Sequence, residues 1–269
     1  MTDIAGRRRA FRKLHESGCF VIPNPWDVGS ARYLAQLGFK ALASTSAGVA
    51  FSRGLPDTGV GRDGILSHLA DLVAATDLPV NADFENGFAH DPAGVAESVR
   101  LCAQTGVAGL SIEDSTGDAA APLYDMAQAV ARIRAARAAL DADVMLVGRA
   151  EGFLVGRPDL DDVIRRLRAY SDAGADCLYA PGLRKPEQIA AIVAAVAPKP
   201  VNVLVSAPIG LSVADLAALG VRRISVGGAL ARAAWGGFVR AATEIAEHGT
   251  FEALADATPH AMLQKLFAS

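Results

Sequence analysis

The sequence lacks the features that mark membrane, secreted and nucleic-acid-binding proteins. No apolar run approaches the ~18 residues of a membrane span, and the arginine-rich N-terminus has no apolar stretch of the signal-peptide kind. The net charge of −3 and the pI of about 6.0 argue against a nucleic-acid partner. Three cysteines, Cys19, Cys102 and Cys177, show no CxxC spacing and lie in apolar settings, which predicts buried thiols in a reducing compartment. We therefore expect a cytoplasmic protein that contacts neither membrane nor nucleic acid.

Eight short apolar runs recur along the chain, and longer amphipathic segments separate them. The runs cover residues 19–24, 40–45, 79–84, 108–114, 143–149, 175–181, 200–206 and 222–228. Strands without polar alternation, each followed by a helix, are typical of a parallel sheet that is buried on both faces. We predict one (β/α)8 barrel domain of the TIM type over residues 1–269, a length that such barrels reach as a single unit. An open doubly wound sheet is the alternative, but no GxGxxG follows the first run.

A glycine precedes each even-numbered run, which supports the repeat. These glycines are Gly38, Gly106, Gly174 and Gly220, at spacings of 68, 68 and 46 residues (106−38, 174−106, 220−174). A glycine just before a strand can take the left-handed backbone conformation that ends a helix. The pattern predicts helix–glycine–strand junctions at the four positions.

Acidic residues gather where the predicted strands end. They are Asp83 and Glu85 after the third run, Glu113 after the fourth and Glu151 after the fifth, together with Arg149. The active site of such a barrel lies at the carboxyl edge of its strands, so we expect these groups to meet there. An oxygen-only set without histidine or cysteine suits Mg²⁺ or Mn²⁺ rather than zinc. The alternative is that the acids are helix caps or ion-pair partners, which we expect for Asp114.

Four segments resemble the isocitrate lyase/phosphoenolpyruvate mutase superfamily in their order and spacing. They are WDVGSARYLAQLGFKALASTSAGVAFSRGLPD, NADFENGF, GLSIEDS and GRAEGF, and the resemblance runs from about residue 18 to 240. Members of the superfamily are (β/α)8 barrels that bind Mg²⁺ and an α-keto acid or its enolate. The resemblance implies a metal-dependent lyase whose partner is a small 2-keto acid or dicarboxylate.

The resemblance also implies roles for the acids and for the arginine. Asp83 looks like the direct Mg²⁺ ligand, with Glu85 and Glu113 holding the waters of the metal. Asp57, in GLPD, resembles the acid beside the substrate. Arg149 matches the arginine that pairs with the second anionic group of the substrate, and an ion pair with Glu151 is the alternative.

Further substrate contacts are expected from small and polar residues at other strand ends. Ser44-Thr45-Ser46 matches the turn that holds the pyruvyl carboxylate, and a simple helix cap is the alternative. Asn202 lies in the seventh run, where it would face the substrate. Trp26 is expected either as a lid over the substrate or as a plug in the barrel mouth.

The chain departs from the superfamily in the loop after the fourth run. Its carbon–carbon lyases carry Lys-x-Cys-Gly-His there, and the cysteine is the acid/base. Here STGDAAAPLYDMAQAV contains no cysteine, histidine or lysine. Decarboxylation of oxaloacetate needs no such group, since CO₂ leaves and the metal stabilises the enolate of pyruvate. The alternatives are C–P bond hydrolysis as in phosphonopyruvate hydrolase, a phosphonomutase-like reaction, a lyase that uses His90 or Tyr124 as its acid, and a 2-keto-acid-binding protein with little turnover.

The superfamily forms tetramers with exchanged C-terminal helices, which implies an oligomer here. Residues from about 230 to 269 are expected to form a C-terminal helical segment, and ALARAAWGGFVRAATEI would pack on a neighbouring copy. We therefore expect a homodimer or homotetramer.

Overall fold

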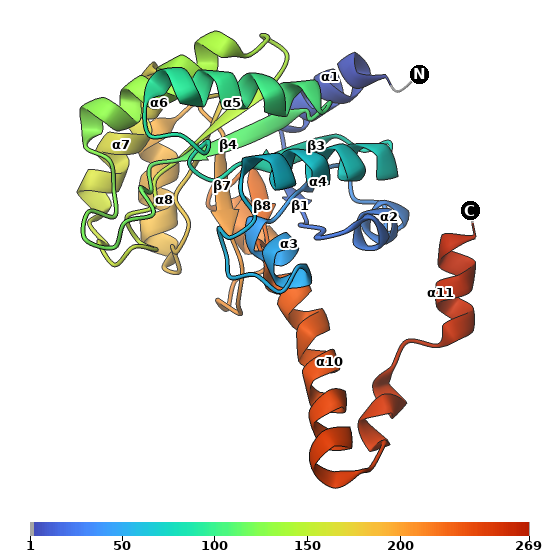
Figure 1. Cartoon of the computed structure of the whole chain (residues 1–269). Helices are drawn as coiled ribbons and strands as arrows, with labels where there is room; N and C mark the ends of the chain where they lie inside the picture. The colour runs from blue at the N-terminus through green and yellow to red at the C-terminus, as the bar shows by residue number, and fades with distance from the viewer. Residues whose placement is uncertain (1–2, 269) are drawn as a thin grey trace.

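The computed structural model describes residues 3–268, in which eight short parallel strands form a nearly closed barrel (Figure 1). The ladder runs in the order β1-β8-β7-β6-β5-β4-β3-β2, and the amide of Ala43 donates to the carbonyl of Pro23 (3.0 Å) across the remaining gap. The predicted barrel is confirmed, and each strand lies inside its predicted run. The strands are β1 Phe20–Ile22, β2 Leu42–Ala43, β3 Val80–Asp83, β4 Gly109–Glu113, β5 Met145–Arg149, β6 Cys177–Tyr179, β7 Val201–Leu204 and β8 Arg223–Ser225.

Helices connect the strands and cover the outside of the barrel. They are α1 Ile4–Leu14, α2 Val28–Gln36, α3 Ser46–Ser52, α4 Arg62–Ala75, α5 Pro92–Gln104, α6 Met126–Ala139, α7 Leu160–Asp172, α8 Pro186–Val196, α9 Val213–Ala218, α10 Ala229–His248 and α11 His260–Phe267, with the 3-10 turn η1 Glu252–Asp256. Many begin at a side-chain cap, as in α5, where Asp91 accepts from the amide of Gly94. The four glycines ahead of the even-numbered strands have φ between 85° and 105°, which confirms the predicted helix ends.

The interior of the barrel changes from apolar to polar along its axis. Phe11 of α1 closes the amino end against buried side chains such as Val147 and Cys177. Toward the carboxyl edge the inward positions carry Asp83, Glu113 and Arg149 instead. The functional groups therefore stand on rigid strands above a packed core. Cys102 and Cys177 are buried as predicted, whereas Cys19 is half-buried.

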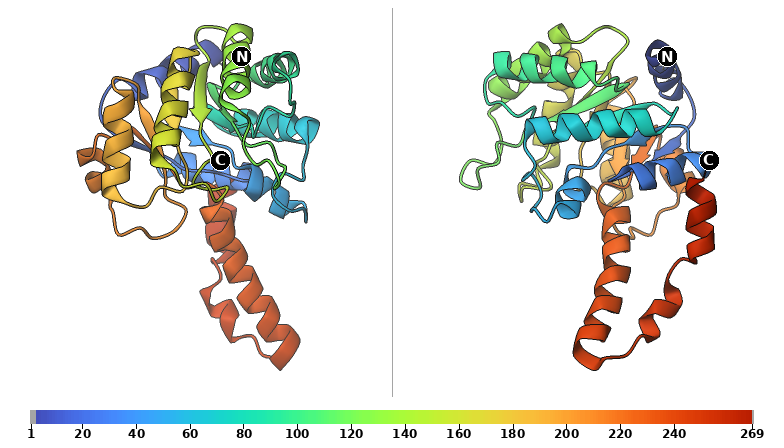
Figure 2. Two further views of the ribbon diagram at one scale, coloured as in Figure 1. Left: turned by 90° about the vertical axis from the view of Figure 1, so that its left-hand side faces the viewer. Right: turned by 45° about the vertical axis from the view of Figure 1, so that its right-hand side comes forward.

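The C-terminal segment leaves the barrel as an arm. Helix α10 projects away from it, and the chain returns through η1 so that α11 lies beside α2 (Figure 2). There Gln36 Nε2 donates to the carbonyl of Leu266 (3.0 Å). Ten of the sixteen large hydrophobic side chains that are exposed in the described residues lie between 230 and 267, which makes the arm the most apolar exposed surface. Within residues 3–268, no helix is both long and apolar enough to cross a membrane.

We propose that a second copy of the chain covers this arm. Phe238 and Phe251 are each more than 60% exposed, and exposed apolar area of this extent marks protein contacts. Phe238→Glu should shift the protein to smaller assemblies in light scattering coupled to size-exclusion chromatography. Val213→Glu, at an exposed valine that begins α9 on the barrel, is the control and should leave the mass unchanged. A wild-type protein that is monomeric at every concentration would contradict the proposal.

Candidate active site

A cavity of about 180 Å³ opens at the carboxyl edge of the barrel. Its walls come from all eight strands and from the turns that follow several of them. The polar residues that border it are Asn24, Ser44, Thr45, Ser46, Asp57, Asn81, Asp83, Ser111, Arg149, Tyr179, Asn202, Arg223 and Ser225. The space suits a small organic acid rather than a nucleotide or a polymer.

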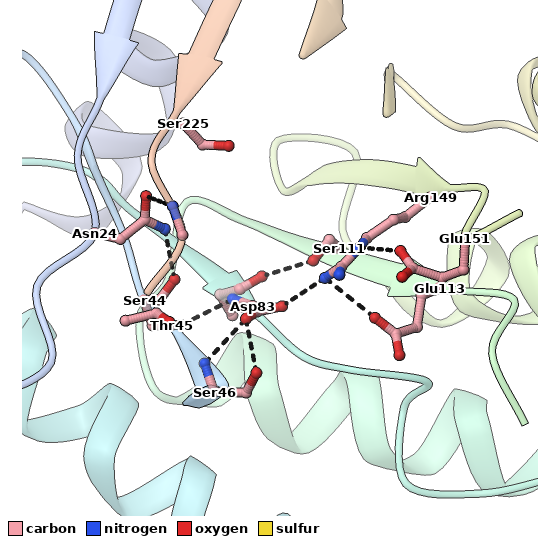
Figure 3. A network of polar contacts seen from close by, with 12 residues as sticks. Asn24, Ser44, Thr45, Ser46, Asp83, Ser111, Glu113, Arg149, Glu151 and Ser225 are labelled. Atoms are coloured by element: carbon pink, nitrogen blue, oxygen red, sulfur yellow. Dashed lines mark hydrogen bonds and ion pairs between the residues drawn. The ribbon is translucent and has the colours of Figure 1, made fainter. Parts of the chain in front are cut away.

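Asp83, the last residue of β3, is fixed by the turn between β2 and α3 (Figure 3). Its Oδ2 accepts from the amide (2.9 Å) and the hydroxyl (3.0 Å) of Ser46, and its own amide donates to Ser44 Oγ (2.8 Å). Thr45 Oγ1 accepts from the amide of Gly48 and so caps α3, the alternative considered for this turn. Ser46 therefore orients the carboxylate of Asp83, Ser44 holds the backbone amide of the same residue, and Thr45 begins a helix.

Arg149, the last residue of β5, lies among three carboxylates (Figure 3). Its Nη1 is 3.0 Å from Asp83 Oδ1 and 3.1 Å from Glu113 Oε2, and its Nε donates to Glu151. The predicted meeting of the strand-end acids with this arginine is confirmed, and so is the ion pair with Glu151. Within residues 3–268, Nη2 of Arg149 makes no hydrogen bond, which leaves one edge of the guanidinium for an anion.

The cluster holds more acid than base. Three carboxylates and one guanidinium carry a formal charge of −2 (−3 + 1). Burial alone would lower the pKa of Arg149, but Glu151 and then Glu113 raise it well above its usual value, so it stays protonated. Burial, against the effect of Arg149, raises the pKa of Glu113. The excess negative charge in a buried place is what a divalent cation would offset.

Glu85 adds a further carboxylate beside this cluster. It sits in the left-handed backbone region (φ 47°), and its Oε1 is buried without a hydrogen-bond partner among residues 3–268. Burial, with Asp83 and Asp57 adding to it, raises the pKa of Glu85 to about 7. A buried carboxylate oxygen without a donor is costly unless some other group satisfies it.

These residues fit a magnesium site with few direct protein ligands. In the described part of the chain no three acidic, histidine or cysteine side chains converge as a ready-made cage. Mg²⁺ usually takes one or two carboxylates and keeps several waters, a demand that Asp83, which borders the cavity, and the nearby Glu85 can meet. The donors are all oxygens, the cluster carries a formal charge of −2 when its three carboxylates are ionised, and one buried oxygen of Glu85 lacks a partner among residues 3–268.

The other predicted substrate residues are only partly gathered at the cavity. Asp57 borders it, and its Oδ1 lies 3.2 Å from Ser46 Oγ. Asn202 also borders it, but its amide donates to Ser225 (3.0 Å) and its oxygen accepts from Arg223 (2.9 Å). Trp26 is half-buried against Gly48 and does not line the cavity.

The floor of the cavity contains a cation that the sequence analysis missed. Arg223 is 3% exposed, and its neighbours are the neutral groups of Asn202, Asn81 and His15. No carboxylate among residues 3–268 forms an ion pair with it. The signal was present, since an arginine interrupts the apolar run 222–228.

The two candidate acids lie elsewhere, His90 in the loop after β3 and Tyr124 in the loop after β4. His90 Nδ1 and the hydroxyl of Tyr124 are 2.7 Å apart, and neither residue borders the cavity. The loop itself folds back through an isolated bridge between Ser115 and Leu123. Asp114 accepts from Tyr170 and Arg166 behind the site, which confirms its predicted structural role.

Known proteins place this architecture in one family. The family model described as phosphoenolpyruvate phosphomutase matches residues 11–246. A crystal structure from Burkholderia cenocepacia J2315, described only as a lyase/mutase, is 54% identical with a TM-score of 0.96, covering 99% of this chain and 98% of that one. An uncharacterized protein of Mycobacterium tuberculosis is 38% identical over 81% of both chains. An oxaloacetate decarboxylase of Paraburkholderia xenovorans is 32% identical over 81% of this chain and 74% of its own.

More distant solved structures carry ligands. A phosphonopyruvate hydrolase in complex with oxalate and Mg²⁺ is 25% identical, with a TM-score of 0.86 over 97% of this chain and 94% of that one. An oxaloacetate acetylhydrolase with the product oxalate is 29% identical, with a TM-score of 0.85 over 98% and 94%.

His15, beside Arg223, predicts a pH dependence of stability. Burial and then Arg223 lower the pKa of His15 from 6.5 to about 3, so the unfolded chain binds a proton that the folded chain does not. The stabilisation is therefore complete above pH 6.5 and is lost as the pH falls toward 3, with a loss of about 2 kcal/mol at pH 5. The difference in unfolding free energy between pH 7.5 and pH 5, from urea titrations, should be larger in the wild type than in His15→Gln by this amount. Equal differences would contradict the assignment.

Proposed function

The chain belongs to the phosphoenolpyruvate phosphomutase family, and on this premise we propose that it decarboxylates oxaloacetate or a substituted relative in a Mg²⁺-dependent reaction. One observation carries the choice of reaction. Among residues 3–268, no cysteine, histidine or lysine borders the cavity. A carbon–carbon lyase needs a positioned acid/base at the substrate carbon, whereas decarboxylation needs only that the developing negative charge be stabilised.

The proposed step balances without a protein acid. The bond between C3 and the carboxylate of oxaloacetate breaks, its electron pair becomes the enolate of pyruvate, and CO₂ leaves. The enolate then takes a proton from water. The residues of this chain bind and orient the reactant. Asp57 and Ser46 border the cavity on one side, and the open edge of Arg149 faces it on another.

Asp83 would hold the Mg²⁺ directly, with Glu85 and Glu113 holding its waters. When bound, the cation supplies positive charge beside the keto oxygen, which favours the enolate. The charge of −2 in the cluster and the unpartnered oxygen of Glu85 support this assignment. Mn²⁺ would suit the same oxygen ligands.

The relatives support an enzyme that acts at a carbon–carbon or carbon–phosphorus bond. The decarboxylase from Paraburkholderia xenovorans matches the proposed reaction, while the phosphonopyruvate hydrolase structure favours C–P hydrolysis, for which Asp57 is placed beside the cavity. A 2-keto-acid-binding protein with little turnover would share the metal site and lack product. The assay below separates the three.

The proposed reaction predicts pyruvate formation from oxaloacetate above the rate of free Mg²⁺. Isocitrate and 2-methylisocitrate should be cleaved negligibly by the same preparation. Asp83→Ala should abolish turnover and weaken binding of oxalate, measured by calorimetry, because the cation is lost. Glu97→Ala, at an exposed acid on α5, is the control and should behave as the wild type.

Four results would overturn this reading. Full activity in EDTA would exclude the metal site, and strong cleavage of isocitrate would exclude the argument from the cavity lining. Phosphate released from phosphonopyruvate, with oxaloacetate untouched, would establish the C–P hydrolase. Tight binding of 2-keto acids without any product would establish a binding protein.

Arg149→Lys should distinguish a substrate contact from a purely structural ion pair. Lysine lacks the planar fork, so it cannot replace Nε toward Glu151 and Nη1 toward Asp83 while presenting an open edge. We expect affinity for oxaloacetate-type dicarboxylates to fall at least about tenfold more than affinity for pyruvate. Equal losses for both ligands, with a lowered unfolding midpoint, would assign Arg149 to structure alone.

A further inference from the structure

Arg132 of α6 is a buried arginine that the proposed reaction does not use. It is 1% exposed, and no carboxylate among residues 3–268 forms an ion pair with it. An arginine in such a place costs folding free energy unless its donors are satisfied. Its two terminal nitrogens donate to backbone carbonyls, while its Nε is buried without a hydrogen-bond partner among residues 3–268, so the arginine acts on the path of the chain.

The carbonyls belong to the loop between β3 and α5. Arg132 Nη1 donates to Ala89 and, at 2.7 Å, to His90, and Nη2 donates to Asn86. All three residues lie within the five positions that follow Glu85. A single guanidinium on α6 therefore binds three carbonyls of the loop between β3 and α5.

The loop between β3 and α5 has a backbone conformation that needs stabilising contacts. Glu85 and Phe88 have φ of 47° and 56°, in the left-handed region that residues with a Cβ rarely adopt. Such a conformation is unfavourable for a residue with a Cβ, and it persists only where surrounding contacts impose it. The contacts of Arg132 are of this kind, because they fix the carbonyls on both sides of Phe88.

The loop after β4 is joined to the same arginine. The guanidinium carbon lies 4.1 Å from the ring centroid of Tyr124, and the hydroxyl of Tyr124 is 2.7 Å from His90 Nδ1. Asn86 Nδ2 also donates to the carbonyl of Ser115 (3.3 Å). Both loops that border the acidic cluster thus share one support on α6.

We propose that Arg132, with Tyr124 and His90, is a positioning device that holds Glu85 at the metal site. Glu85 has a buried carboxylate oxygen and a backbone that the loop forces into an unusual conformation. His90 and Tyr124 then serve as parts of this support rather than as an acid for catalysis. The inference rests on the proposed metal site, but its first test is independent of metal binding.

The first test is hydrogen exchange of the metal-free protein. Arg132→Lys keeps the charge but loses the fork, so amides in residues 85–90 should exchange about tenfold faster while those of β4 and β5 keep their protection. Tyr124→Phe keeps the ring under the guanidinium but loses the bond to His90, and should give a smaller increase in the same amides. Unchanged exchange in residues 85–90 of Arg132→Lys would overturn the proposal.

The second test is Mn²⁺ affinity, measured by electron paramagnetic resonance without substrate. Arg132→Lys should weaken Mn²⁺ about 10- to 100-fold, as loss of an outer support does at metal sites. Arg8→Gln is the control, because Arg8 is a buried arginine that donates to the carbonyls of Val107 and Ala103 at the opposite end of the barrel. It should lower the unfolding midpoint and leave Mn²⁺ binding unchanged.

The outcomes separate this inference from the proposed function. Faster loop exchange with unchanged Mn²⁺ affinity would reduce Arg132 to a structural residue and overturn the inference alone. A wild-type protein that fails to bind Mn²⁺ would overturn the metal site, and with it the claim that Glu85 is held for a metal. Faster exchange together with weaker Mn²⁺ binding would establish the inference.

Discussion

The contact of Arg149 with three carboxylates organises the carboxyl edge of this barrel. Arg149 and Glu113 are register partners on neighbouring strands, and Asp83 comes from the strand beyond. Removing one member of a buried ion cluster leaves the others uncompensated, which usually costs far more than the cluster gains. The serine turn after β2 then orients the other oxygen of Asp83, and the loop held by Arg132 carries Glu85 into the same region. The proposed reaction and the local structure of the carboxyl edge therefore both depend on the charges of Arg149 and its carboxylate partners.

The cavity is electrically asymmetric as a consequence. Acids dominate its mouth, where Asp57 and Asp83 stand near Glu85, while the floor carries Arg223 among neutral amides. An anionic reactant that approaches the mouth meets repulsion unless a cation neutralises the acids. Arg149 alone cannot do so, because it already balances its own partners. A divalent cation fits this need. Because the acids repel any anion while the cation is absent, the affinity of the cavity for each anion depends on the bound cation.

The strands, the helix ends and the acids at strand ends could be predicted from the sequence, because each follows from one local physical cause. Side-chain orientations that depend on tertiary packing could not. Strands buried on both faces must be apolar throughout, so all eight strands could be located in the sequence. The backbone at Gly106 must be left-handed, so the end of the preceding helix could be located as well. The acids at strand ends were placed together because parallel strands end at one edge. Whether Trp26 faces the cavity, and whether His90 turns toward Tyr124, depends on rotamers and loop paths that no local pattern encodes. Arg223 could not be assigned in this way, because it begins β8 and the pattern concerns residues at the carboxyl ends of strands.

The pairing of β1 with β8 has a consequence for synthesis on the ribosome. Residues 20–22 find their partners only at 223–225, so the ring cannot close until nearly the whole barrel has emerged. At roughly 5–20 residues per second, the interval is about 10–40 s. During it the edge of β1 exposes unpaired backbone groups that could pair with another nascent chain. The order of synthesis therefore leaves one edge of the first strand unpaired until the last strand of the barrel is available.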